Sequence, residues 1–217
     1  FEATYIFETL KKSKIAVLYV KTDWGAGIKN VFADEWKKRG GSVLVEEGFE
    51  QSSRDLRISL AKIKAKKAQL VYFVGYTDES IAALKQAAEL KLAAPFFGTD
   101  VWEDPKIFAA AGKAAEGAMY PVVASSANVE FLANMKTKTG SDMASACSVA
   151  AYDAVQLLAR VFRQAGLDSV AIKNELYKTV YVGGVSMPEI RFDERGDLLH
   201  PSYVVRVAKD GKAEERK

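Results

Sequence analysis

The chain has 217 residues, of which 49% are hydrophobic and 27% are charged, proportions that are ordinary for a globular protein with a substantial core. Its 31 basic and 28 acidic residues leave a formal net charge of +3, which argues against nucleic acid or an anionic membrane as an obligate partner. A single cysteine, Cys147, and a single histidine, His200, exclude an internal disulfide and a cysteine- or histidine-rich metal site. We therefore expect no bound metal.

Extended and helical segments alternate over the first 121 residues. The strands are short, continuous apolar runs such as KIAVLYV, which are typical of strands buried on both faces. The helices between them carry their apolar residues on one face, as Ile28, Phe32 and Trp36 do. In chain order the predicted elements are helix 3–11, strand 14–20, helix 27–41, strand 42–47, helix 52–68, strand 70–76, helix 78–92, strand 94–100, helix 104–112 and strand 117–123.

This alternation predicts the fold class. Strands separated by helical segments of about 10–15 residues indicate βαβ units and a parallel sheet. Because crossovers between parallel strands are right-handed, the helices should cover both faces of that sheet. We predict an α/β architecture, a doubly wound sheet covering residues 1–121.

The remaining chain is predicted to be mostly helical from 126 to 178, followed by extended segments and a final strand near 203–208. In the helix over 143–165 we expect the buried residues to be Ala150, Ala154, Leu157, Leu158 and Val161. Cys147 lies in the same small-residue segment and is expected to be a buried, inert thiol. The charged end, 209–217, is expected to be a solvated tail.

Three strand-to-helix turns share an unusual composition. KTDWGAG, GYTDES and GTDVWED each hold a carboxylate, a glycine and an aromatic residue, the aromatics being Trp24, Tyr76 and Trp102. The carboxyl ends of parallel strands meet at one edge of a sheet, where ligands bind. Three aromatics there favour a concave site for an organic ligand. The alternative is that they cover the end of the sheet as ordinary core, while acids such as Asp78 and Asp104 cap helices.

An enzyme is not expected. The glycines of GAG at 25–27 open a helix, as in dinucleotide-binding proteins, but Asn30 stands where the third glycine belongs, and four residues separate the motif from its strand. No GK[ST] phosphate loop is present, and no nucleophile is paired with the one histidine. The pattern indicates a site that holds a ligand without a cofactor and without reacting with it.

Several segments of the sequence match a known protein family in their order and spacing. They are KIAVLYVKTDWGAG, VYFVGYTDES, APFFGTD, AAEGAMY, VAAYDAVQLLA and the RFDERGD turn followed by YVVRV. The chain resembles the periplasmic solute-binding proteins of branched-chain amino-acid ABC transporters over nearly its whole length. That resemblance implies the type I periplasmic-binding-protein fold, which has two flavodoxin-like lobes joined by three crossing strands.

By this resemblance, residues 1–121 and 201–217 would be the carboxyl-terminal ligand-binding lobe, and 122–200 the returning portion of an incomplete amino-terminal lobe. Members of the family begin with a signal peptide and an amino-terminal lobe, and the chain, which opens on Phe1, would start after both. The apolar face of the helices over 143–165 and 168–178 is then expected to pack against a cleaved fragment or another chain, or to be poorly ordered.

The resemblance also implies three site residues. Trp24 matches an aromatic that closes over the ligand, and Tyr76 matches a tyrosine that reaches it. Asp100 matches an acidic residue, usually glutamate, that pairs with the ligand's α-ammonium. Trp102 completes the predicted ligand-binding set as a further aromatic of the same edge. Aspartate is one methylene shorter than glutamate, which leaves the size of the ligand open.

The function implied is that of an exported binding protein, periplasmic or extracellular, which captures an amino acid or a similar small solute by hinge closure and delivers it to an ABC permease. An effector-binding sensor or regulator domain of the same fold is the alternative. A helix-turn-helix or a membrane segment in the missing amino-terminal sequence would favour the sensor, and a signal peptide would favour transport.

Overall fold

The computed structural model describes residues 1–124, 129–140 and 146–216. These form two compact units, Phe1–Val122 with Val204–Lys217, and Val123–Tyr203. Two predicted helical segments, the one that starts at 126 and the helix over 143–165, have their first residues outside the described part of the chain.

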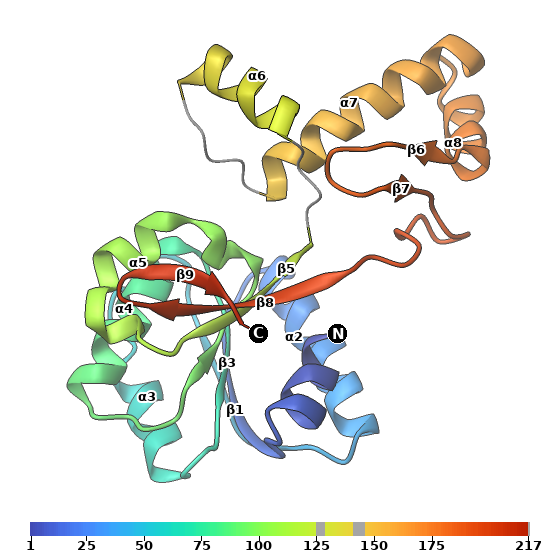
Figure 1. The fold of residues 1–217 in the computed structure, drawn as a ribbon. Coiled ribbons are helices and arrows are strands. Elements are labelled where there is room, and N and C mark those ends of the chain that lie inside the picture. Colours follow the sequence, from blue (N-terminus) through green and yellow to red (C-terminus); the bar gives the residue numbers. More distant parts are fainter. Residues whose placement is uncertain (125–128, 141–145, 217) are drawn as a thin grey trace. The chain divides into compact units, whose positions relative to one another are not determined.

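The first unit contains the predicted parallel sheet (Figure 1). Strands β2, β1, β3, β4 and β5 lie side by side in that order and pair in parallel, and the antiparallel pair β8 and β9 follows at the edge next to β5. The bounds are β1 Lys14–Val20, β2 Ser42–Phe49, β3 Val71–Val74, β4 Phe96–Phe97, β5 Met119–Val123, β8 Tyr203–Lys209 and β9 Lys212–Glu215. The predicted solvated tail at 209–217 is mostly exposed over its described residues, but over 212–215 it is not an unstructured tail, because the chain forms β9 there.

Helices lie on both sides of the sheet, with α3 and α4 on one side of β1 and β3 and α2 on the other (Figure 1). The helical elements are α1 Glu2–Thr4, the π-helix η1 Tyr5–Thr9, α2 Asp23–Lys38, α3 Arg57–Ala65, α4 Thr77–Glu89, the 3-10 helix η2 Asp100–Glu103, α5 Pro105–Ala111 and the 3-10 helix η3 Gly112–Ala115. Because side chains alternate along a strand, Leu18 and Phe73 pack under α3 to α5, while Val17 and Tyr72 pack under α1 and α2. The doubly wound arrangement is thus confirmed.

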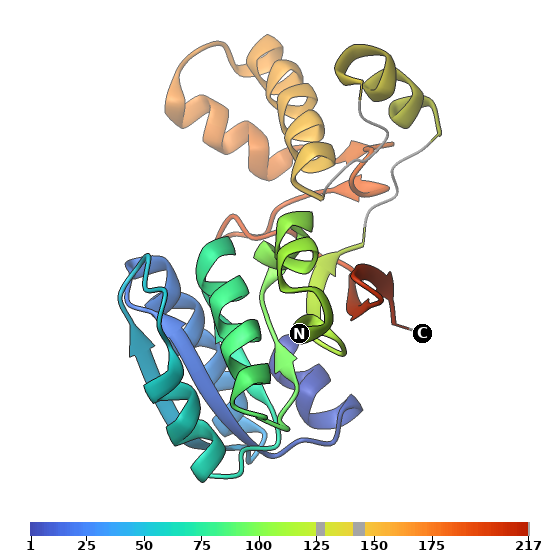
Figure 2. The same cartoon turned by 90° about the vertical axis from the view of Figure 1, so that its left-hand side faces the viewer.

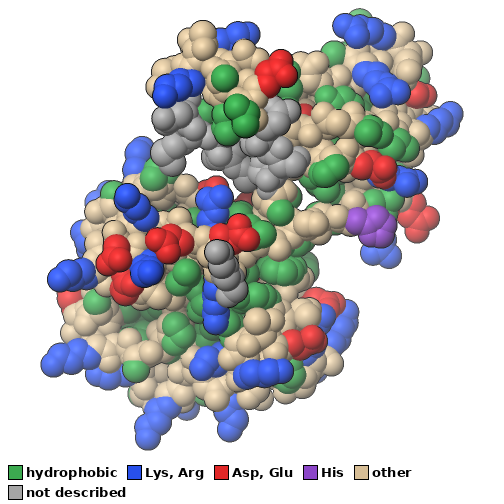
Figure 3. Space-filling view, viewed as in Figure 1, with side chains coloured by type: hydrophobic (Ala, Val, Ile, Leu, Met, Phe, Trp, Pro, Cys, Tyr) green, Lys and Arg blue, Asp and Glu red, His purple; other side chains and the backbone are tan. Residues whose placement is uncertain are grey.

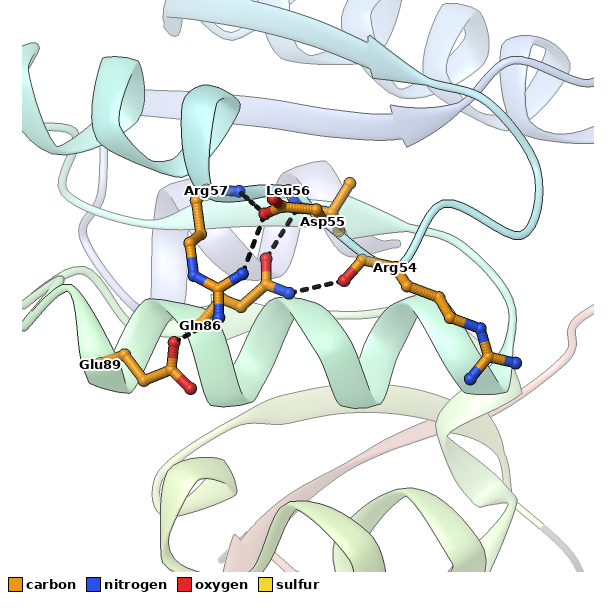
Figure 4. A network of polar contacts seen from close by, with 6 residues as sticks. All are labelled: Arg54, Asp55, Leu56, Arg57, Gln86 and Glu89. Carbon is orange, nitrogen blue, oxygen red and sulfur yellow. Dashed lines mark hydrogen bonds and ion pairs between the residues drawn. The ribbon is translucent and has the colours of Figure 1, made fainter.

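A buried glutamine joins α3 to α4 (Figure 4). The side chain of Gln86, on α4, accepts a hydrogen bond from the backbone N–H of Leu56 at 2.7 Å and donates one to the carbonyl of Arg54 at 2.7 Å. On the outer side of this contact, Arg57 pairs with Asp55 at 3.2 Å and with Glu89 at 2.8 Å. The segment before α3, which was predicted to be helical from 52, is non-helical because its backbone groups are bound by Gln86 instead of by a preceding turn.

The second unit is built from α6 Val129–Thr139, α7 Ala146–Ala165, α8 Ser169–Lys178 and the antiparallel pair β6 Tyr181–Val182 and β7 Glu189–Ile190. Figure 2 shows it from a second direction. Leu157 and Val161 of α7 pack with Met187 and Ile190 in a small apolar cluster. Asp153, also on α7, accepts hydrogen bonds from the turn between β6 and β7, from the backbone N–H of Val185 at 2.9 Å and of Ser186 at 2.6 Å, and from the Ser186 hydroxyl at 2.6 Å.

The predicted buried face of α7 is only partly right. Leu157 and Val161 are buried, but Ala150, Ala154 and Leu158 are exposed. The reason is that Asp153 must face the turn it binds, which rotates its own side of the helix inward. Cys147 is also exposed, which corrects the expectation of a buried thiol.

The exposed side of α7 is itself apolar. Tyr152, Val155, Leu158 and Phe162 follow one another at helical spacing and are 36–64% exposed. Figure 3 shows hydrophobic side chains at the surface of this unit. Of the helices in the described part of the chain, none is long and apolar enough to cross a membrane.

Candidate functional site

The first turn of the candidate site follows β1. The Thr22 hydroxyl oxygen accepts a hydrogen bond from the backbone N–H of Gly25 at 3.2 Å and so caps α2. Gly25 itself is packed against the end of β1, where a β-carbon would overlap the carbonyl of Val20. The chain can therefore turn sharply into α2, and this turn holds Trp24, half-buried, at the carboxyl edge of the sheet.

Tyr76 stands at the equivalent point after β3, which is the neighbour of β1 in the sheet. Its ring stacks on that of Trp24, with centroids 4.9 Å apart and an interplanar angle of 21°. Both rings are half-buried, so that the pair rests on the core and keeps an exposed side. An aromatic pair of this kind offers an apolar surface with a phenol at its edge.

Trp102 does not share that surface. Its side chain is fully buried within the core, 6.1 Å from the ring of Phe73 and 6.4 Å from that of Tyr120. Its indole N–H donates to the hydroxyl of Ser80 at 2.9 Å, and that hydroxyl donates to the carbonyl of Tyr76 at 2.7 Å. Trp102 is thus linked through Ser80 to the backbone of Tyr76. Because its side chain is buried, Trp102 is not one of the proposed ligand contacts. For this residue the core alternative is the better one.

Asp100 begins η2, separated by two residues from the end of β4, and is exposed. The residue before it, Thr99, is 3% exposed, and its hydroxyl has no hydrogen-bond partner within the described chain. The other acids of the three turns have different surroundings. Asp104 caps α5 through the backbone N–H of Lys106, as predicted, whereas Asp78 makes no cap. Asp78 faces Arg54 instead, at 3.5 Å.

Sequence reasoning missed an acidic residue close to Asp100. Glu2, on α1, accepts a hydrogen bond from the hydroxyl of Tyr72 on β3. Burial raises the pKa of the Glu2 carboxyl to about 7; the Tyr72 hydrogen bond lowers it, and the charge of Asp100 raises it. Burial, followed by the charge of Glu2, raises the pKa of the Tyr72 phenol well above its usual value. No local motif indicates this contact, because the partners are 70 residues apart in the chain.

The described residues contain no group of three or more histidine, cysteine, aspartate or glutamate side chains that could hold a metal ion. What the carboxyl edge of the sheet presents is a stacked aromatic pair and an exposed carboxylate, with a second, half-buried carboxyl beside the latter. Such a set can hold a small organic molecule that carries a positive charge.

The fold and this edge define a class of protein. The sequence profile of the family described as periplasmic binding protein matches residues 2–212. The chain therefore belongs to the periplasmic binding protein family, and the predicted resemblance to solute-binding proteins of the Leu/Ile/Val type is confirmed.

The chain is 30% identical over 213 residues to Leu/Ile/Val-binding protein homolog 1 of Brucella suis, covering 93% of this chain and 55% of that protein. It matches the crystal structure of a leucine-binding protein from Thermotoga maritima with a TM-score of 0.88 and 24% identity, over 100% of this chain and 63% of the other. A branched-chain amino-acid transporter substrate-binding protein from Streptococcus pneumoniae, crystallised with isoleucine, matches with a TM-score of 0.80 and 24% identity, over 98% and 62%.

These likenesses confirm the predicted α/β fold as that of type I periplasmic binding proteins. The chain spans about half the length of the curated relatives that it matches.

Proposed function

We propose that the chain is part of the extracytoplasmic solute-binding component of an ABC transporter, which captures an amino acid or a similar small organic solute between two lobes. The family and the names of the relatives support the class of protein. The observation that carries the assignment of the site is that the ends of β1, β3 and β4 bring a stacked aromatic pair and an exposed carboxylate to one edge of the sheet.

Each group has a role that suits an amino acid. The carboxylate of Asp100 accepts hydrogen bonds from the ligand's ammonium, a charge-assisted contact that contributes about 1.5–3 kcal/mol. The rings of Trp24 and Tyr76 cover the apolar part of the ligand. The groups that bind the ligand's carboxylate belong to the amino-terminal lobe, of which this chain holds only the returning portion, so that closure of the two lobes completes the site.

The division into lobes follows from the same proposal. Residues 1–121 and 201–217 form the carboxyl-terminal ligand-binding lobe, and 122–200 return to the amino-terminal lobe. The exposed apolar side of α7 suits this arrangement, because it requires a cover that the described residues do not supply. A cavity of about 780 Å³ between α6 and α7, lined in part by Phe131, Met135 and Tyr152, extends the same surface. We assign the cover of this apolar surface to the remaining length of this protein. The bound ligand is then delivered to a membrane permease.

The ammonium contact is tested in the complete protein, with its remaining length restored. A thermal-shift screen of the twenty amino acids identifies the ligand, and isothermal titration calorimetry then measures its Kd. Replacing Asp100 by Asn should weaken binding about 10- to 150-fold, which corresponds to the loss of about 1.5–3 kcal/mol. Asp23→Asn is the matched control, because Asp23 is an exposed acid of the same edge, in the first turn of α2. Equal affinities of the wild type and Asp100→Asn would refute the role of Asp100.

A further inference from the structure

Glu2 is a half-buried acid that the proposed site does not yet use. It lies at the beginning of α1 and is bound by the hydroxyl of Tyr72. Tyr72 pairs with Phe97 in the register of β3 and β4. The ring of Tyr5, the next turn of the same helical segment, also meets the ring of Phe97, at a centroid distance of 6.0 Å. The start of the chain therefore lies over the end of β4.

This position brings Glu2 close to Asp100, which is only three residues beyond Phe97. The charge of Asp100 raises the pKa of both Glu2 and Tyr72, as expected for neighbours. Neither carboxylate forms an ion pair with a lysine or arginine of the described chain. Glu2 and Asp100, neither of them paired with a lysine or arginine of the described chain, therefore lie at the edge where the ligand's ammonium is expected.

Burial raises the pKa of Glu2 to about 7, the Tyr72 hydroxyl lowers it by donating to the carboxylate, and Asp100 raises it. The free amino group of Phe1 also lowers the pKa of Glu2, and in the complete protein, where Phe1 follows another residue, the loss of that charge raises the pKa of Glu2 further. Glu2 is therefore partly protonated near neutral pH.

We propose, on the basis of the proposed function, that Glu2 is a second acidic group of the ammonium subsite and releases its proton to solvent when an amino acid binds beside Asp100. A ligand without a positive charge cannot cause this release. Glu2 thus contributes to the preference of the site for molecules with an ammonium group, which pair with two carboxylates instead of one.

The sign of the effect follows from linkage. The ammonium of the ligand opposes the charge of Asp100 and favours the ionised form of Glu2, so that the pKa of Glu2 falls on binding from about 7. The bound state then holds fewer protons than the free state, and affinity must rise with pH up to that value and level off above it. A decrease of about one unit in the pKa corresponds to a tenfold gain in affinity between acid and alkaline pH.

The test uses the complete protein and the amino acid that binds most tightly in the screen described above, with isoleucine as the first probe. Calorimetric titrations from pH 5.5 to 8.5, in pairs of buffers with different ionisation enthalpies, measure both Kd and the number of protons released. For the wild type we expect affinity to rise about tenfold with increasing pH, and proton release to be largest over the pH range of that rise.

Two variants separate Glu2 from other groups. Glu2→Gln keeps an acceptor for Tyr72 but cannot ionise, and should bind without proton release and with a flat pH profile. Tyr72→Phe removes the hydrogen bond that lowers the pKa of Glu2, and should move the rise in affinity to higher pH. His200, the only histidine of the sequence, is retained in every variant, so that its own titration cancels from the comparison.

The outcomes distinguish this inference from the proposed function. If no amino acid binds to the wild type, the proposed function fails and the role of Glu2 falls with it. If amino acids bind and Glu2→Gln releases as many protons as the wild type, the inference alone is overturned. Should Glu2→Gln not fold, Tyr72→Phe decides, because an unchanged midpoint contradicts the proposal.

Discussion

Replacing Gln86 by methionine tests how the first unit is held together. The two side chains have nearly the same length and both are favourable in a helix, so that α4 and the volume of the core are preserved. The substitution removes both the amide oxygen and the amide nitrogen of the glutamine side chain. The backbone N–H of Leu56 and the carbonyl of Arg54, each bound at 2.7 Å, then lose their partners.

The cost follows from the burial of these groups. Gln86 is 6% exposed and its contact with Leu56 is buried, so that this N–H cannot turn to water. An unpaired buried backbone group costs about 1–3 kcal/mol, and the partly buried carbonyl of Arg54 adds a value near the lower end of that range. We expect the free energy of unfolding to fall by about 2–4 kcal/mol, a large share of the 5–15 kcal/mol typical of a domain.

Urea unfolding followed by tryptophan fluorescence measures this loss, because Trp24, Trp36 and Trp102 are the only tryptophans of the sequence and all belong to the first unit. Arg57→Gln is the control, since it breaks only the exposed pairs with Asp55 and Glu89 and should leave the midpoint nearly unchanged. If both variants unfold at the same urea concentration, the argument from buried backbone groups is wrong.

Two further substitutions test local packing. Gly98→Ala would place a methyl group against the indole of Trp102, which is enclosed by the core, and should destabilise the first unit by about 1–3 kcal/mol in the same urea assay. Asp153→Ala removes the buried acceptor of three hydrogen bonds from the turn after β6, and should expose the amides of Val185 and Ser186 to fast hydrogen exchange.

Each of these has its own comparison. Gly27→Ala is matched to Gly98→Ala, because a β-carbon at Gly27 meets no atom within 4 Å and should leave stability equal or slightly higher. Asp168→Ala is the control for Asp153→Ala. Asp168 caps α8 at the surface, and its loss should lower the free energy of unfolding by only about 1 kcal/mol. A Gly98 variant as stable as the Gly27 variant, or unchanged protection in the Asp153 variant, would contradict the packing described here.

The sequence by itself determined the parallel α/β part of the first unit. Strands buried on both faces of a parallel sheet are continuous apolar runs, and the helices that cover them are apolar on one side. These local patterns were enough to predict the order in which the strands and helices follow one another along the chain. It also predicted that Trp24, Tyr76 and Asp100 follow strands whose carboxyl ends share one edge, because parallel pairing leaves no other arrangement.

Only the tertiary structure decided which side chains face the solvent at that edge. Trp102 follows its strand as Trp24 does, but Gly98 leaves space for its ring and Ser80 provides an acceptor for its N–H, so that it turns into the core. Glu2 meets Tyr72 only once α1 lies on the sheet. Local patterns in the sequence indicate the periodicity of a helix or strand. Contacts between residues distant in the chain depend on packing, and such contacts determine both the burial of Trp102 and the position of Glu2 beside Asp100.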